Sequence, residues 1–319
     1  MRFEPKLRLR AVLALWLIAV ATALAAKPKP IPIVLDTDIG SDIDDAFALA
    51  LILKSPELDL RAVTTVSGDT AARARLAAKM LWVAGRRDVP VAAGTPGGKL
   101  DMAQTRWAEG FTSPSLLHES AVHLMKSQID RGHGAIVIVA IGPLTNVAAL
   151  LEQYPGEKKR IKRIVLMGGS IARGYYPGSG PTAEYNIAAD SKASQIVFSS
   201  GVPITMAPLD VTARLQLDAA HRQEIFAQAT PLAEALHSLY VLWGQPTPTL
   251  HDPMAVSLLL DPRLCTLKPL AVQITDKGMT VVQKGRRPNA VVAVETNPAR
   301  FIAFYTSRVT SLVGPKPIR

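Results

Sequence analysis

The chain has 319 residues, of which 48% are hydrophobic and 19% charged, a balance that excludes an intrinsically disordered protein. Its formal net charge of +10 is moderately basic, but no long Lys/Arg run with interleaved aromatic residues is present, which argues against a nucleic-acid partner. The single cysteine, Cys265, excludes an intramolecular disulfide.

The first 25 residues have the pattern of a signal peptide. A basic leader precedes the apolar stretch AVLALWLIAVATALA, which ends in the A-x-A sequence Ala23-Leu24-Ala25. We therefore expect a mature chain that starts at Ala26 and is exported, to a periplasm or to the outside. An uncleaved membrane anchor is the alternative, which the short length of the stretch disfavours. After cleavage we expect no stable membrane insertion.

Apolar runs typical of buried strands then alternate with helical patterns. The predicted strands are 33–35, 58–66, 89–94, 135–142, 163–169 and 202–210, and the predicted helices between them are 43–54, 70–85, 120–132, 143–155 and 188–201. Residues 215–260 look helical, 267–275 and 279–296 look like late strands with a hairpin, and 301–313 form a closing helix. Strands that are apolar throughout and alternate with helices indicate a mostly parallel sheet covered on both faces. The sequence therefore predicts a single-domain, Rossmann-like α/β fold over residues 26–319.

Residues 95–119 do not fit this alternation. They have little periodicity, several turn residues and two large side chains, Trp107 and Phe111. Long irregular segments in a compact domain are often functional, so we expect a lid over a site.

Five aspartates, Asp36, Asp38, Asp42, Asp44 and Asp45, follow the first predicted strand within ten residues. Unpaired carboxylates this close repel one another, and a hard cation such as Ca²⁺ or Mg²⁺ is the simplest remedy. Open α/β sheets bind ligands at the carboxyl ends of their strands, where this cluster lies.

Three other interpretations of the cluster exist. A helix cap is one, because Ser41-x-x-Asp44 fits a capping box, but it leaves Asp36 and Asp38 unexplained. An EF-hand loop is excluded because Ser41 and Phe47 stand where that loop needs its glycine and its bidentate acid. The string Asp36-Thr37-Asp38 also resembles the Asp-x-Asp motif of metal-dependent phosphatases.

The full string DTDIGSDIDDAFAL (36–49) resembles better the signature of the nucleoside hydrolases, the inosine-uridine-preferring N-ribohydrolases, with two extra residues between the glycine and the paired acids. Later segments resemble further motifs of that family in the expected order: AVTTVSGDT (62–70), AIGPLTNVA (140–148), VLMGG (165–169), AEYN (183–186) and LHDPMAV (250–256). Taken singly, AEYN could be a surface helix start and His251-Asp252-Pro253 a helix cap. Together, the segments fall at strand ends or in loops after strands.

The resemblance implies a hydrolase that splits the N-glycosidic bond of nucleosides and holds Ca²⁺. It implies that the Ca²⁺ ligands are Asp38, Asp45, Asp252 and the Ile141 carbonyl. Asp38 would also be the general base that takes a proton from the attacking water. His251 would protonate or hydrogen-bond the leaving base, or orient Asp252.

The resemblance also implies residues that contact the sugar: Asp44, Asp69, Met167, Glu184 and Asn186. Asp69 stands where many members have Asn, and Gly178 where they often have an Asn at the 5′-hydroxyl, so Tyr175, Tyr176 or Ser179 would substitute there. The usual His-containing pattern is missing from 95–119, and Trp107 would either stack on a base or anchor its loop to the core. Asp36 and Asp42 are further candidates near the metal.

The leading hypothesis is thus an exported, Ca²⁺-dependent nucleoside N-glycosidase that releases a base and ribose. A binding protein for nucleosides or sugars without turnover is the second hypothesis, motivated by Asp69 and Gly178. The Asp-x-Asp phosphatase is the third, and it gives AEYN and LHDP no role. The resemblance also implies a homo-oligomer.

Overall fold

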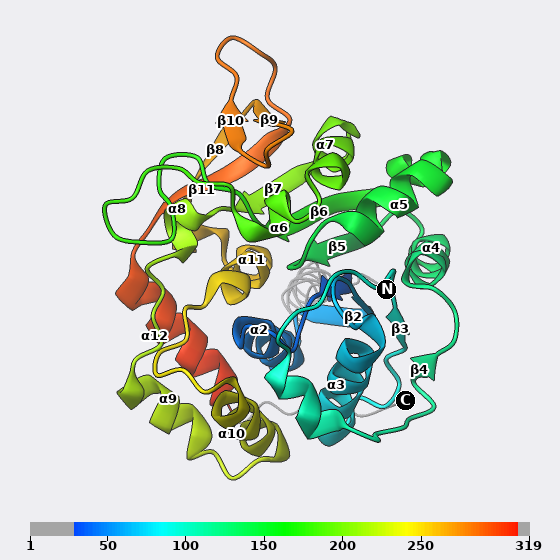
Figure 1. Ribbon diagram of the computed structural model, residues 1–319, viewed down its shortest axis with the longest axis vertical. Coiled ribbons are helices and arrows are strands. Elements are labelled where there is room, and N and C mark those ends of the chain that lie inside the picture. The colour runs from blue at the N-terminus through cyan, green and yellow to red at the C-terminus, as the bar shows by residue number, and fades with distance from the viewer. Residues whose placement is uncertain (1–28, 312–319) are drawn as a thin grey trace, which may run out of the picture. The chain divides into compact units, whose positions relative to one another are not determined.

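A nine-stranded sheet forms the centre of residues 29–311, which are the part of the chain that the computed structural model describes (Figure 1). The predicted signal peptide, residues 1–25, lies outside these residues. The strands are β1 (Ile31–Thr37), β2 (Leu58–Thr65), β3 (Val91–Ala93), β4 (Leu116–Leu117), β5 (Ile136–Ala140), β6 (Ile161–Met167), β7 (Ile204–Ala207), β8 (Cys265–Leu270), β9 (Val272–Ile274), β10 (Thr280–Val282) and β11 (Ala290–Thr296).

The α-helices and 3₁₀ helices fill the connections between these strands. The α-helices are α2 (Asp44–Leu53), α3 (Thr70–Val83), α4 (Ala121–Gly132), α5 (Thr145–Gln153), α6 (Tyr185–Ala188), α7 (Ser191–Ser199), α8 (Leu209–Thr212), α9 (Ala219–Phe226), α10 (Pro231–Trp243), α11 (His251–Leu260) and α12 (Pro298–Val309). The 3₁₀ helices are η1 (Ala103–Ala108), η2 (Pro155–Lys159) and η3 (Pro262–Leu264).

The strand order in the sheet is β4-β3-β2-β1-β5-β6-β7-β11-β8. All neighbours pair in parallel except β8 and β11, while β9 and β10 form a separate antiparallel pair. The mostly parallel sheet is therefore confirmed. β1 lies between β2 and β5, so the strand order reverses there, and such a switch point opens a crevice at the carboxyl ends of the strands.

Helices cover both faces of the sheet, as expected. One core packs α2, α3, α10, α11 and α12 against it, and the other packs α4, α5 and α7 on the opposite face (Figure 1). All ten residues of α2 are buried, which explains why its sequence is apolar on every side after Asp44 and Asp45. Among residues 29–311, no helix has both the length and the apolar composition needed to span a membrane.

The expectation of an irregular segment over residues 95–119 was only partly correct. The segment contains η1, and β4 pairs with β3 through Val91 and Leu116 at the edge of the sheet. A strand of two residues is too short to produce a periodic sequence pattern, which is why the sequence did not reveal it.

Candidate active site

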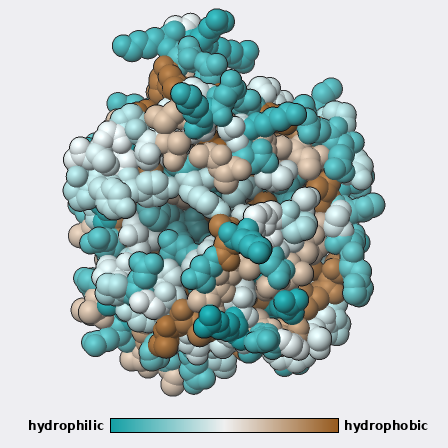
Figure 2. Space-filling model, in the orientation of Figure 1, coloured by the Kyte–Doolittle hydropathy of each residue, from teal (hydrophilic) through white to brown (hydrophobic). Residues whose placement is uncertain are grey.

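A cavity of about 280 Å³ opens at the carboxyl ends of β1, β5 and β6. In the space-filling view, hydrophilic residues line a hollow near the middle of this face (Figure 2). Seven carboxyl residues line the cavity, namely Asp38, Asp42, Asp44, Asp45, Asp101, Glu184 and Asp252, and within the described part of the chain no Lys or Arg lines it. The other lining residues are Ser41, Leu100, Ile141, Met167, Tyr175, Tyr185, Asn186 and His251.

Asp44, Asp45 and Asp252 form the tightest carboxylate group. One oxygen of each lies within 4.8 Å of the others, and all three residues are buried. Asp44 and Asp45 open α2, and Asp252 lies in the first turn of α11, so two helix N-termini face this group. The N-cap residues of these helices, Ile43 and Leu250, make no side-chain capping bond, so an ordinary N-cap does not account for these acids.

Burial raises the pKa of each of these three carboxyl groups well above its ordinary value, and repulsion from the neighbouring carboxylates, Asp38 and Asp42 included, adds to the effect. The Asp252 backbone N–H donates to Asp44 Oδ2 at 3.2 Å, and the Thr37 hydroxyl donates to Asp45 Oδ1. These two bonds favour the ionised forms but leave most of the carboxylate oxygens free for a ligand.

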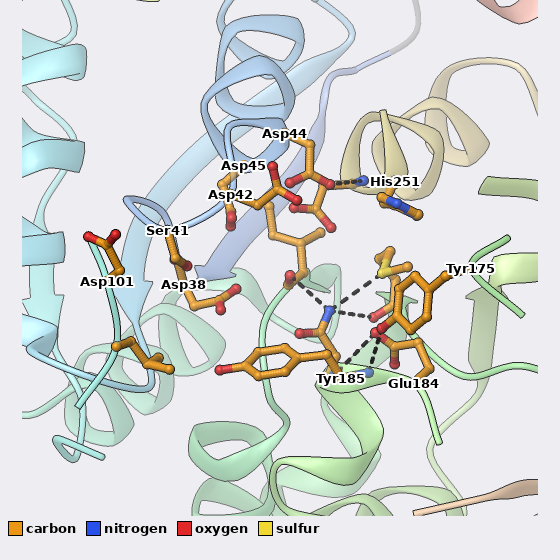
Figure 3. A pocket seen from close by; sticks show the side chains of 15 residues that line it. Asp38, Ser41, Asp42, Asp44, Asp45, Asp101, Tyr175, Glu184, Tyr185 and His251 are labelled. Atoms are coloured by element: carbon orange, nitrogen blue, oxygen red, sulfur yellow. Dashed lines mark hydrogen bonds between the residues drawn. The ribbon is translucent and has the colours of Figure 1, made fainter. Parts of the chain in front are cut away.

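Asp38 faces the same cavity from the end of β1 (Figure 3). Burial raises its pKa to about 6, and the charge of Arg73 opposes this rise. Asp38 Oδ1 lies so close to Gly142 that a Cβ at this glycine would come within 2.8 Å of it. Gly142 follows β5, and its missing side chain therefore leaves room for the Asp38 carboxylate.

The opposite wall of the cavity comes from the segment after β6. Glu184 is buried and accepts hydrogen bonds from the backbone N–H groups of Gly169, Asn186 and Ile187. Asn186 Nδ2 donates to the carbonyls of Ile141 at 3.1 Å and Met167 at 3.3 Å. AEYN is thus a helix start whose Glu184 and Asn186 are buried and join the ends of β5 and β6, while Tyr185 is exposed.

His251 and Tyr175 stand beside each other at one side of the cavity (Figure 3). Their rings are 6.2 Å apart in an edge-to-face arrangement, and His251 Nδ1 is 2.9 Å from Thr212 Oγ1. Burial lowers the pKa of His251 to about 4, so the imidazole is neutral at pH 7. Burial also raises the pKa of Tyr175, whose hydroxyl accepts from the Tyr185 backbone N–H.

Five of the sequence candidates do not line this cavity: Asp36, Asp69, Trp107, Tyr176 and Ser179. Asp36 is fully buried behind it, Asp69 is exposed and caps α3 by accepting from Ala72 N at 2.9 Å, and Tyr176 is 78% exposed. Trp107 packs on the core, and the ammonium of Lys79 lies over its ring. This position corresponds to the alternative in which Trp107 anchors its loop, not to the one in which it stacks on a base.

Sequence reasoning missed several residues at the site: Arg73, Leu100, Asp101, Gln104, Tyr185 and Thr212. Arg73 carried a usable signal, because it falls on the same helical stripe as Leu76, Ala77 and Met80. A charged residue on the buried stripe of a helix is rare unless something satisfies it.

The donor set suits a hard divalent cation. The cavity offers buried carboxylate oxygens within a few ångströms of one another, and the Ile141 carbonyl lies at its wall. Oxygen-only ligands in a flexible arrangement are what Ca²⁺ takes, and its charge would offset the repulsion among the aspartates.

Comparisons with known proteins agree with this geometry. Residues 33–303 match the family described as "Inosine-uridine preferring nucleoside hydrolase". The pyrimidine-specific ribonucleoside hydrolase RihA of Citrobacter koseri is 35% identical over 305 residues, covering 86% of this chain and 96% of the relative.

Solved structures show the same fold. A plant nucleoside hydrolase, PpNRh1, superposes with a TM-score of 0.78 at 27% identity, covering 88% of this chain and 99% of that one. The purine-preferring ribonucleoside hydrolase from Gardnerella vaginalis superposes with a TM-score of 0.76 at 26% identity, covering 88% and 98%.

Proposed function

The chain belongs to the inosine-uridine preferring nucleoside hydrolase family, and from this membership we propose that its acidic cavity binds Ca²⁺ and hydrolyses ribonucleosides to a free base and ribose. The chain is therefore an N-glycosyl hydrolase, and its family is metal-dependent. The observation that carries the proposal is the buried carboxylate group of Asp44, Asp45 and Asp252 beside Asp38 at the switch point of the sheet.

Asp38, Asp45, Asp252 and the Ile141 carbonyl would hold the cation. A bound divalent ion supplies two effects: it lowers the pKa of a coordinated water and it orients vicinal hydroxyls of the sugar. Asp44 belongs to the observed cluster with Asp45 and Asp252, whereas Asp38 does not. Asp44 would therefore serve as a further ligand of the cation or accept a hydrogen bond from a sugar hydroxyl.

Asp38 is the general base in this proposal. It takes a proton from the water that attacks the anomeric carbon, a task suited to a carboxyl group whose pKa burial raises to about 6. The breaking N-glycosidic bond leaves positive charge on the sugar ring, as in other glycoside hydrolyses. Glu184 is a buried carboxylate on the opposite wall and can stabilise that charge, while Asn186 and Met167 contact the sugar.

The leaving base would contact His251 and Tyr175. Because His251 is neutral at pH 7 and Thr212 engages its Nδ1, the remaining ring nitrogen can hydrogen-bond to the base. The relatives differ in the base named for them, pyrimidine-specific for RihA and purine-preferring for the Gardnerella enzyme, so both classes belong in the substrate panel.

The test is base release from uridine, cytidine, inosine, adenosine and guanosine, followed by chromatography with Ca²⁺ present. We expect one or more substrates to yield base and ribose in equal amounts. Calorimetric binding of a nucleoside without any product would favour the binding-protein alternative, and neither binding nor product across the panel would contradict both.

The structure gives the phosphatase alternative little support. An Asp-x-Asp nucleophile must reach its substrate, whereas Asp36 is 0% exposed and accepts from Thr64 and Asn146 behind the cavity. Formation of an aspartyl-phosphate from a sugar phosphate would reverse this conclusion.

Export is a separate part of the proposal. It rests on the basic leader, the apolar stretch and the A-x-A sequence of residues 1–25. N-terminal sequencing of the protein recovered outside the cytoplasm should begin at Ala26, and an intact Met1 terminus would contradict it.

A further inference from the structure

The loop between β1 and α2 carries the acids of the site, yet it has little internal hydrogen bonding. Asp38 ends one side of it and Asp44-Asp45 the other, so its path sets the separation of these carboxylates. It includes the two extra residues noted in the sequence, and Gly40 within it has a φ of 121°.

Arg73 of α3 holds the first half of this loop. Its guanidinium Nη1 donates to the carbonyls of Asp38 and Ile39, the latter at 2.9 Å, and to Ser41 Oγ at 3.2 Å. Its Nε donates to the Ser67 carbonyl at 2.8 Å, which ties the β1–α2 loop to the β2–α3 loop.

The guanidinium is sealed from solvent. Arg73 is 0% exposed and forms no ion pair with a carboxylate among residues 29–311. It lies beneath two glycines, since a Cβ at Gly40 or Gly68 would lie 3.8 or 3.4 Å from its terminal nitrogens. Burying a charged group that bonds only to neutral carbonyls costs free energy. Its presence here therefore indicates that the loop geometry it holds has a role.

Gln104 of η1 holds the second half of the loop. This residue is also 0% exposed, and its Nε2 donates to the carbonyls of Ser41 at 3.1 Å and Asp42 at 2.7 Å. Four of the five consecutive carbonyls from Asp38 to Asp42 are thus bound by two side chains. One comes from α3, and the other from the segment 95–119.

We propose that Arg73 and Gln104 are positioning residues that fix the 38–43 loop and thereby set the distance from Asp38 to the group of Asp44, Asp45 and Asp252. The segment 95–119 then works as a support for the metal-binding loop in addition to bordering the cavity with Leu100 and Asp101. This inference deepens the proposed function, because it concerns the residues assigned to the cation.

The test uses Arg73→Met and Gln104→Met, with matched controls elsewhere in the fold. Arg163→Met removes a half-buried arginine of β6, and Gln128→Met removes a buried glutamine of α4, neither of which contacts the loop. We expect Arg73→Met and Gln104→Met to bind Ca²⁺ about 10- to 100-fold more weakly by calorimetry, as when the support of a metal ligand is lost. At saturating Ca²⁺ their kcat should fall more than KM changes, whereas the controls should alter thermal stability alone.

Amide hydrogen exchange of residues 38–45 in the chelated protein is the readout that needs neither metal nor turnover. Exchange should accelerate in Arg73→Met and Gln104→Met and stay unchanged in both controls. Arg73→Ala leaves room for a small molecule in place of the missing side chain. Guanidinium at a non-denaturing concentration should restore its Ca²⁺ affinity, whereas urea, which has a similar shape but no charge, should not.

Unchanged exchange together with Ca²⁺ affinity within twofold of wild type would overturn the proposal, even if the variants melt earlier. If Arg73→Met fails to fold, Gln104→Met decides by the same criteria. A wild-type protein that binds Ca²⁺ but releases no base would contradict the proposed function and leave the exchange and affinity comparison intact.

Discussion

At the scale of single residues, Asp36 and Asp38 show how strongly position decides the role of a carboxylate. β1 ends at Thr37, so Asp38 leaves the alternation of the strand and turns into the cavity. Asp36 stays in the sheet, accepts from Thr64 and Asn146 through Oδ1, and has no hydrogen-bond partner for Oδ2 among the described residues. Burial raises its pKa to about 7.

This shift predicts a pH dependence of stability. A carboxyl group with a raised pKa in the folded state stabilises most at low pH, and this contribution is lost as the pH rises from about 4 through 7, at about 1.4 kcal/mol per pKa unit. In chelator, Asp36→Asn should therefore show a flatter dependence of the unfolding free energy on pH across this range, measured by urea denaturation. A slope equal to that of wild type would mean that Asp36 is not the group responsible.

Asp69 separates a structural role from a substrate role. As an exposed N-cap of α3, it should cost about 1 kcal/mol of stability when replaced by Ala, while Asp69→Ser keeps the acceptor and most of the stability. Because Asp69 does not line the cavity, KM should not change in either variant. A severalfold rise of KM in Asp69→Ala would instead show that Asp69 contacts the sugar, as the sequence resemblance implied.

The sequence predicted most of the residues that carry the proposed chemistry. It did not predict the residues that fix their positions. Five aspartates after one strand stand out in any sequence, and motif resemblance added Glu184, Asn186 and Asp252. For Arg73 the only signal was its place on the buried stripe of its helix, which does not reveal what it binds. Gln104 had no signal, because its partners are backbone carbonyls far away in the chain, and a carbonyl has no sequence signature.

At the scale of elements, the alternation of strands and helices was predicted because each parallel strand is buried on both faces and therefore reads as continuously apolar. The pairing of β8 with β11 and of β3 with the two-residue β4 depends on contacts across the fold, so local patterns could not reveal it. The helix α2 was predicted from its apolar run, but its burial on all sides follows from its packing against α11, α12 and the sheet.

The contact between α12 and α2 gives a prediction at this scale. Tyr305 of α12 donates its hydroxyl to the Phe47 carbonyl of α2 at 3.0 Å, and both residues are fully buried. Tyr305→Phe should cost about 1 kcal/mol of stability and leave base release unchanged. The matched control is Tyr240→Phe, whose hydroxyl makes an exposed bond to Pro246, and a melting temperature that falls equally in both variants would contradict the argument.

At the scale of the whole molecule, charge is distributed unevenly. The chain carries a formal net charge of +10, yet seven of its 26 acidic residues line one cavity. Such a concentration of carboxylates stabilises the fold only when a cation is bound or protons are taken up.

Calcium added to protein that has been stripped of metal with a chelator should therefore raise its melting temperature in a concentration-dependent way. Binding to the folded state alone contributes about 2.7 kcal/mol when the free ion exceeds its Kd by 100-fold. Asp252→Asn should abolish most of this shift, since it removes a member of the three-carboxylate group. A Ca²⁺-dependent rise of the melting temperature that is equally large in Asp252→Asn would show that the ion binds elsewhere.

In the proposed reaction, Asp38 and a bound Ca²⁺ act together to hydrolyse the N-glycosidic bond. The most direct measurement is the rate of base release by wild type and Asp38→Asn, each stripped with chelator and then titrated with Ca²⁺. We predict that wild type loses its activity on stripping and regains it with Ca²⁺, while Asp38→Asn stays at least about 100-fold slower at every Ca²⁺ concentration. Full activity of wild type in chelator would show that the reaction does not need Ca²⁺, and full activity of Asp38→Asn with Ca²⁺ would show that Asp38 is not the general base.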